Sequence, residues 1–155
     1  MATQPASFQW ISSVSESLVI RMGAATGASA SWVAVDDTGA ILGGVGSGAL
    51  ADAALAAASR QAIVLAPALD VMRARADLPL RSGPRLLQAL PFALEEQLAE
   101  DVDALHFAPG TRADDGPLPV AAVRRTLMEE GIARLAAAGI RRARLYSEAD
   151  AVGSM

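Results

Sequence analysis

The order of the short apolar segments in the first half of the chain constrains the fold most strongly. Three strand-like runs and an alanine-rich helix come first, at residues 18–22, 32–35, 41–45 and about 50–59. The next run, Ala62–Ala66, is apolar throughout, which is typical of a strand covered on both faces of its sheet. Between the second and third runs, Asp36–Gly39 has the composition of a tight turn joining antiparallel strands. This β-β-β-α-β order predicts an α/β lobe.

A helical segment is expected to begin after Ser82, a residue suited to the N-cap. Four leucines, spaced three, four and four residues apart, predict its buried face: Leu87, Leu90, Leu94 and Leu98. Pro91 stands in the middle of this segment, where it lacks an N–H group and clashes with the preceding turn. We therefore expect a kink at Pro91, or two abutting helices.

The remaining elements follow at shorter intervals. Alternating or apolar runs predict strands at residues 71–76, 105–108, 120–123 and 141–146. Thr126 and Glu129 form a capping-box pattern for a third helix, whose apolar stripe would be Met128, Ile132 and Leu135 and whose end would be Gly139. The predicted organisation is a lead-in over residues 1–16, a first lobe over 17–81, a second α/β subdomain over 82–150 and a ragged end over 151–155.

Composition excludes several classes of function. The chain has no cysteine and one histidine, His106, so disulfides, thiol catalysis and sites that need two histidines are ruled out. All 13 basic residues are arginines, which argues against a P-loop ATPase, a Schiff-base enzyme or a lysine-rich nucleic-acid binder. The net charge of −4 and the aromatic content of 4% also argue against a nucleic-acid partner. No membrane-spanning run or secretory leader is evident, so we expect a soluble cytosolic domain.

Three patterns in the sequence could mark sites of chemistry. The glycine-rich run Gly43–Gly48 precedes a helix and could cradle a phosphate, but it lacks a following lysine, and a strand-to-helix turn explains it better. Asp36, Asp52 and Asp70 could hold two magnesium ions, although each has a local explanation in a turn, a first helical turn or a strand start. A structural role is also favoured for His106. We therefore expect no catalytic residue, no metal and no cofactor.

Charge is segregated along the second half of the chain. Between Glu95 and Asp115 there are seven acids and one arginine, whereas Arg124–Arg144 contains six arginines and two glutamates. One interpretation is that these are solvated faces, or neighbouring elements that neutralise each other. The other is a charged docking surface that steers a partner. For that surface we select Glu95, Glu96, Glu100, Asp101 and Asp103, and, as a weaker candidate, Arg141, Arg142 and Arg144.

The most specific pattern in the chain is the run from Leu90 to Ala108, LPFALEEQLAEDVDALHFA. It resembles the hallmark segment of the type II secretion system protein L (GspL) family. Ile63–Pro67, Asp70 and Ala76–Pro79 also fit that family, and the similarity runs from about residue 18 to 148. The resemblance implies an actin-like ATPase fold built of RNase H-like lobes, each a mixed sheet with flanking helices.

The same resemblance implies a function in protein secretion. Proteins of this family belong to the inner-membrane platform of type II secretion, and their cytoplasmic part recruits the secretion ATPase, protein E, by binding its N-terminal domain. A membrane helix and a periplasmic domain that pairs with protein M complete the family pattern, and both are missing from this sequence. The expected location is thus the cytoplasmic face of the bacterial inner membrane, and self-association as a homodimer stays open.

The resemblance also bears on catalysis. Actin-like ATPases place an aspartate on the first strand to hold metal and phosphate, whereas this chain has Arg21 and Met22 there. We therefore expect a scaffold that is not an enzyme. Two alternatives remain: an actin-like ATPase that uses the Gly23–Ser31 loop with its Thr26 and Gly27, and the related scaffold of type IV pilus assembly.

Overall fold

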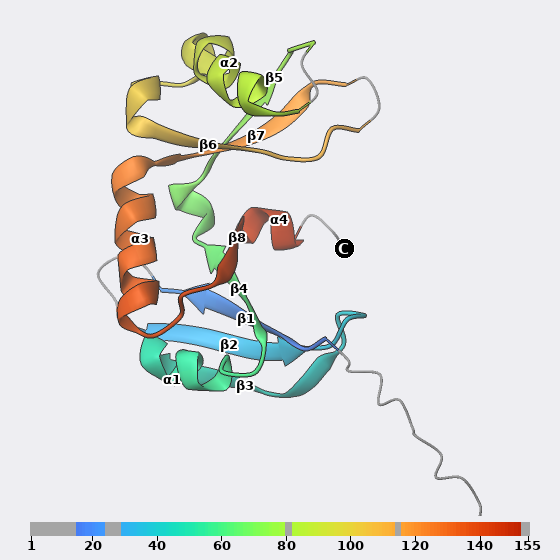
Figure 1. Cartoon of the computed structure of the whole chain (residues 1–155), viewed down its shortest axis with the longest axis vertical. Coiled ribbons are helices and arrows are strands. Elements are labelled where there is room, and N and C mark those ends of the chain that lie inside the picture. The colour runs from blue at the N-terminus through green and yellow to red at the C-terminus, as the bar shows by residue number, and fades with distance from the viewer. Residues whose placement is uncertain (1–14, 24–28, 80–81, 114–115, 153–155) are drawn as a thin grey trace, which may run out of the picture.

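The first lobe is a five-stranded mixed sheet (Figure 1). The computed structural model describes residues 15–23, 29–79, 82–113 and 116–152. The strands are β1 (Ser17–Met22), β2 (Ser29–Val35), β3 (Ile41–Ala49), β4 (Gln61–Ala66) and β8 (Ala143–Ser147). They lie in the order β3-β2-β1-β4-β8. The first three form an antiparallel meander, whereas β4 runs parallel to both β1 and β8. The β-β-β-α-β order predicted from the sequence is confirmed.

One face of this sheet forms the larger hydrophobic core. Leu18 and Ile20 alternate on β1 and are buried, as is Val64 on β4, because successive side chains of a strand point to opposite faces. Helix α1 (Leu50–Ala56) contributes Leu50 and Ala53 to the same core. Leu135 and Ile140, from the second half of the chain, complete it. The first sheet therefore needs distant residues to cover its apolar face.

The second sheet has three antiparallel strands and its own core. It consists of β5 (Met72–Ala76), β6 (Leu105–Pro109) and β7 (Leu118–Arg124), in the order β5-β7-β6. Helix α2 (Pro84–Leu94) packs on it through Leu86, Leu90 and Leu94. The 3₁₀ turns η2 (Glu95–Gln97) and η3 (Val102–Ala104) link α2 to β6. The two cores share no residue, so each sheet has a separate apolar centre.

The second sheet is inserted between two adjacent strands of the first sheet. The chain leaves β4 through η1 (Ala68–Asp70), builds the second sheet, and returns along α3 (Arg125–Ala137) to β8, which pairs with β4 (Figure 1). The sheets therefore do not divide at residue 81 as predicted. Met72–Ala76, assigned to the first lobe, belongs to the second sheet, and Ala143–Ser147, assigned to the second subdomain, belongs to the first.

The buried face of α2 contains Leu86 where the predicted apolar stripe has Leu87. The buried residues are Leu86, Leu90 and Leu94, spaced four apart, while Leu87 is 51% exposed. Leu98 is not helical, because the helix ends at Leu94 and η2 follows. Two abutting helices are not formed: α2 is continuous through Pro91. Burial of Leu90 and Leu94 on the sheet stabilises the helix despite the hydrogen bond that the proline cannot donate.

Helix α3 also begins differently from the prediction. It starts at Arg125, directly after β7, so Thr126 lies inside the helix and does not cap it. Leu135 is buried as predicted, but Ile132 is exposed. Gly139 follows the last turn with φ of 97°, a conformation that glycine adopts without strain, so the predicted C-terminal stop is confirmed. None of the helices found in the described residues has the length and apolar character needed to cross a bilayer.

The role of α2 in the second core can be tested with a matched pair of substitutions. Leu90 is fully buried, so Leu90→Ala should destabilise the protein by about 2–5 kcal/mol through lost burial and the cavity that remains. Leu87→Ala, the same change at a half-exposed position of the same helix, should cost much less. Urea denaturation of both variants measures the difference. Equal losses would contradict the assignment of the buried face.

Candidate functional site

The carboxyl ends of the three parallel strands meet at one edge of the first sheet. Arg21, near the end of β1, donates from its Nε to the Oε1 of Glu148 at 2.5 Å. Glu148 opens α4 (Glu148–Val152), directly after β8, and its Oε2 accepts from the backbone N–H of Ala68 at 3.4 Å. Asp150 of α4 is paired with Arg73 on β5 of the second sheet. Helix α4 therefore ties both sheets together through its carboxylates.

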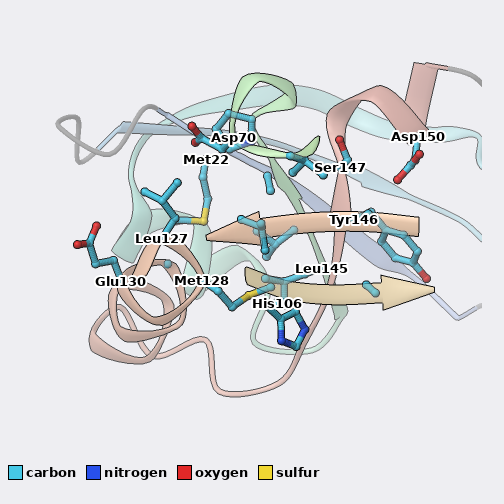
Figure 2. Close-up of a pocket in the computed structure, with 18 of the residues that line it drawn as sticks. Met22, Asp70, His106, Leu127, Met128, Glu130, Leu145, Tyr146, Ser147 and Asp150 are labelled. Atoms are coloured by element: carbon cyan, nitrogen blue, oxygen red, sulfur yellow. The ribbon is translucent and has the colours of Figure 1, made fainter. Parts of the chain in front are cut away.

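A cavity of about 310 Å³ lies beside this edge. Its walls come from β1, β4 and β8 of the first sheet, from β6 and β7 of the second, and from α3 (Figure 2). Most of the lining is apolar, including Met22, Val64, Leu127, Met128 and Leu145. The edge of the first sheet, the inserted sheet and the returning helix thus enclose the space together.

The acidic segment, Glu95–Asp103, lies on the second sheet's side of the molecule. Glu95 and Glu96 are exposed on η2, and Asp101 and Asp103 are exposed at η3. The side chain of Gln97 donates to the backbone oxygen of Arg75 at 3.1 Å, which attaches η2 to β5. The segment therefore presents its carboxylates from a backbone held against the inserted sheet.

Glu100 differs from the other members of the acidic segment. Its carboxylate accepts from the Nε and the Nη2 of Arg124 at 2.7–3.0 Å. These hydrogen bonds lower the pKa of Glu100 below its ordinary value and raise that of Arg124. Arg125 donates to the backbone oxygen of Asp103 at 3.0 Å. For Glu100 and Arg124, the interpretation that neighbouring charged elements neutralise each other is the correct one.

The second predicted cluster, Arg141, Arg142 and Arg144, lies elsewhere. Arg141 and Arg142 precede β8 and Arg144 is on it, and all three side chains are exposed. They belong to the first sheet, at the C-terminal end of α3, whereas the acidic segment adjoins the N-terminal end of α3 (Figure 1). Because 13 residues separate the ends of this helix by about 20 Å, the two clusters form separate surfaces.

The three aspartates that could hold magnesium ions lie apart, at the turn before β3, at the start of α1 and in η1. Asp36 accepts from the backbone N–H of Thr38 and Ala40 and from the Thr38 hydroxyl, and these hydrogen bonds lower its pKa. Asp52 accepts from the backbone N–H of Ala49 at 3.1 Å, at the start of α1. Asp70 lies in η1. Among the residues that the structure describes, no three carboxylate or histidine side chains gather to hold a metal ion.

The glycine-rich run Gly43–Gly48 is neither a phosphate loop nor a turn. It lies within β3, and a Cβ on Gly46 would come within 2.3 Å of the indole nitrogen of Trp32. Its small residues therefore admit the tryptophan ring from the neighbouring strand. His106 is exposed on β6 and lines the cavity. In the Gly23–Ser31 loop considered for nucleotide, residues 24–28 lie outside the described residues, and residues 29–31 belong to β2.

Comparison with known proteins decides the family. The family model described as type II secretion system (T2SS), protein L, matches residues 18–153. The chain belongs to this family. Type II secretion system protein L of Pseudomonas aeruginosa is 40% identical over 84 residues, covering 54% of this chain and 22% of that protein. Its counterpart in Dickeya chrysanthemi is 38% identical over 96 residues, covering 60% and 24%. The chain thus spans less than a quarter of the length of these relatives.

A solved structure matches the fold. The cytoplasmic domain of EpsL, an inner-membrane component of the type II secretion system of Vibrio cholerae, aligns with a TM-score of 0.69 at 24% identity. The alignment covers 86% of this chain and 57% of that domain. The expected mixed sheet with flanking helices is confirmed, and the fold is that of the EpsL cytoplasmic domain. The chain thus belongs to a family whose curated members are type II secretion system proteins.

The cavity and the Arg21–Glu148 pair were not anticipated from the sequence. Arg21 and Glu148 are 127 positions apart, and no local pattern predicts such a contact. The signal that was available is the basic residue on the first strand, where an actin-like ATPase has an acid. The pairing of β8 with β4 brings Glu148 to the same edge of the sheet as Arg21, and the sequence does not reveal that pairing.

The Glu100–Arg124 pair predicts a pH dependence. A carboxyl whose pKa is lowered by folding stabilises the folded state at pH values above its unfolded pKa, here 4.5. This stabilisation is lost as the pH falls through the pKa that the group has in the folded state. Glu100→Gln should therefore lower the melting temperature slightly near neutral pH, since the pair is exposed, and the gap from wild type should narrow below pH 4.5 and close once the pH is below the lowered pKa of Glu100. A gap that persists there, or a similar loss in Glu95→Gln, would contradict this role.

Proposed function

We propose that this chain is a non-catalytic docking domain that recruits the secretion ATPase, protein E, to the cytoplasmic face of the bacterial inner membrane by binding the N-terminal domain of protein E. The proposal rests on the exposed acidic segment, whose carboxylates project from a backbone attached to β5 through Gln97. In the complete protein of this family, we propose that the membrane helix and protein M join the same platform.

The shape of this surface suits protein recognition. Phe92, on the last turn of α2, is 80% exposed and lies three residues before Glu95 and four before Glu96. Aromatic side chains are frequent anchors at interfaces, because they bury a large apolar area with few rotatable bonds. Surrounding charges then steer the encounter and set the register of the complex. We propose that Phe92 is the apolar centre and that the exposed acids of the segment form its rim: Glu95, Glu96, Asp101 and Asp103.

The edge of the first sheet supports a role without catalysis. The Arg21 guanidinium and the Glu148 carboxylate bind each other at the carboxyl end of β1. The Arg21 guanidinium repels a metal ion at this place, and β1 has no carboxylate that could hold one. The alternative function, an actin-like ATPase, requires such a ligand. We therefore infer that protein binding is the activity of this domain.

Charge reversal on the acidic segment tests the docking proposal. The double variant Glu95→Arg, Glu96→Arg should weaken binding to the N-terminal domain of protein E by about tenfold or more, since both rim charges become repulsive to a basic partner. The thermal melt should change little, because both side chains are exposed. Glu100 is unsuitable for this test, because its reversal would break the pair with Arg124.

Asp37→Arg provides the matched control, since this residue is exposed on the turn between β2 and β3 of the other sheet. Its affinity should equal that of the wild type, as measured by isothermal titration calorimetry. Unchanged affinity in the double variant would overturn the assignment of the acidic segment.

Nucleotide addition tests the absence of catalysis. ATP with magnesium should not raise the melting temperature of the chain, because a ligand stabilises only the state that binds it. The same assay on a nucleotide-binding actin-like protein provides the positive control. A saturable rise in melting temperature, or magnesium-dependent release of phosphate, would favour the ATPase alternative.

A further inference from the structure

The cavity lies where α/β proteins commonly bind ligands. In open sheets, ligands bind outside the carboxyl ends of parallel strands. Met22, Ala66 and Ser147 line the cavity from the ends of β1, β4 and β8. Its volume of about 310 Å³ also matches the lower range of small-molecule sites. Location and size are therefore both those of a binding site.

A glycine inside α3 keeps part of this space open. Gly131 lies in the middle of the helix and lines the cavity, and a Cβ there would meet nothing within 4 Å. Glycine in a helix interior destabilises it by roughly 0.5–1 kcal/mol relative to alanine. No neighbouring atom in the described part of the chain requires a glycine at this position, since the space beside Gly131 is empty. A ligand that fits against the bare helix backbone explains why a side chain is missing at this position.

The walls indicate the chemistry of that ligand. Apolar side chains, Val64, Leu127 and Leu145 among them, supply most of the surface. Of the described residues, three acidic ones, Asp70, Glu130 and Asp150, line the cavity against one basic residue, Arg134, so the net charge of the walls is negative, which disfavours an anionic ligand. At the adjoining sheet edge, Arg21 is held by Glu148, and Arg73 is held by Asp150. A phosphate-bearing molecule would thus meet carboxylates, and the nearby Arg21 and Arg73 already form ion pairs within the chain.

We propose that the cavity between the two sheets binds an uncharged, largely apolar small molecule, which packs between the apolar strand residues and the α3 backbone at Gly131. This site is separate from the docking surface around Phe92, because it lies among β1, β4, β8 and α3. It does not depend on the recruitment of protein E.

A pair of fluorescent probes tests the proposed site and its charge preference. N-phenyl-1-naphthylamine is neutral and apolar, and 8-anilinonaphthalene-1-sulfonate has the same aromatic frame with a sulfonate added. The neutral probe should bind saturably with one-to-one stoichiometry and should raise the melting temperature. The sulfonate should bind about tenfold more weakly, because carboxylates line the cavity.

Substitutions at Gly131 locate the probe. Gly131→Phe places a ring in the open space and should weaken binding of the neutral probe by about tenfold or more. Gly131→Ala is the matched control: it also replaces glycine with a better helix former but fills little volume, so it should retain the probe. Ala121→Leu, on the β7 wall, provides a second blocking variant if Gly131→Phe does not fold.

The outcomes separate the proposal from its alternatives. Loss of the neutral probe in a folded blocking variant, with retention in Gly131→Ala, supports the site. Absence of saturable binding to the wild type overturns it. Equal binding to the wild type and to a folded blocking variant also overturns it, because the probe then lies on an exposed apolar surface such as β3.

Discussion

The parallel pairing of β4 with β8 holds this molecule together. Ala62 pairs with Ala143 and Ala66 with Ser147, so two segments separated by the whole second sheet become neighbours. Leu135 and Ile140, which lie just before β8, are buried in the core of the first sheet. Without this pairing, the apolar face of β1 and β4 would lose its cover, and α4 would not reach Arg21. The inserted sheet is therefore anchored at both of its ends.

This arrangement assigns different tasks to the two sheets. The first sheet provides the frame, and its parallel edge carries the Arg21–Glu148 pair. The inserted sheet has its own core and exposes Phe92 and the acidic segment away from that frame. Sequence changes on the inserted sheet can thus alter a binding surface without disturbing the frame, which suits a domain whose proposed activity is recognition.

The strands could be predicted from the sequence because the pattern that identifies each strand is contained in that strand. The alternation of Leu18 and Ile20, the apolar run Ala62–Ala66 and the turn at Asp36 each depend on a few adjacent residues. The domain boundary could not be read in this way. Whether Ala143–Ser147 joins one sheet or the other depends on which distant strand offers a free edge, and its own sequence does not encode that choice.

The errors within elements have similar causes. The predicted cap at Thr126 fails because β7 continues to Arg124 and passes directly into α3, which leaves no turn for a capping residue. The predicted stripe through Leu87 fits the spacing as well as the observed one through Leu86, and only the position of the sheet distinguishes them. Of the eight predicted contact residues, Glu100 is held within the chain by Arg124. The other seven remain predictions as partner contacts.

Calorimetric titration of the wild-type chain with the N-terminal domain of protein E, at low and at high salt, tests the central claim most directly. The proposed docking mechanism predicts saturable one-to-one binding that weakens as salt screens the acidic rim, while apolar contact at Phe92 preserves part of the affinity. Absence of binding at both salt concentrations would contradict the claim that this domain recruits the ATPase.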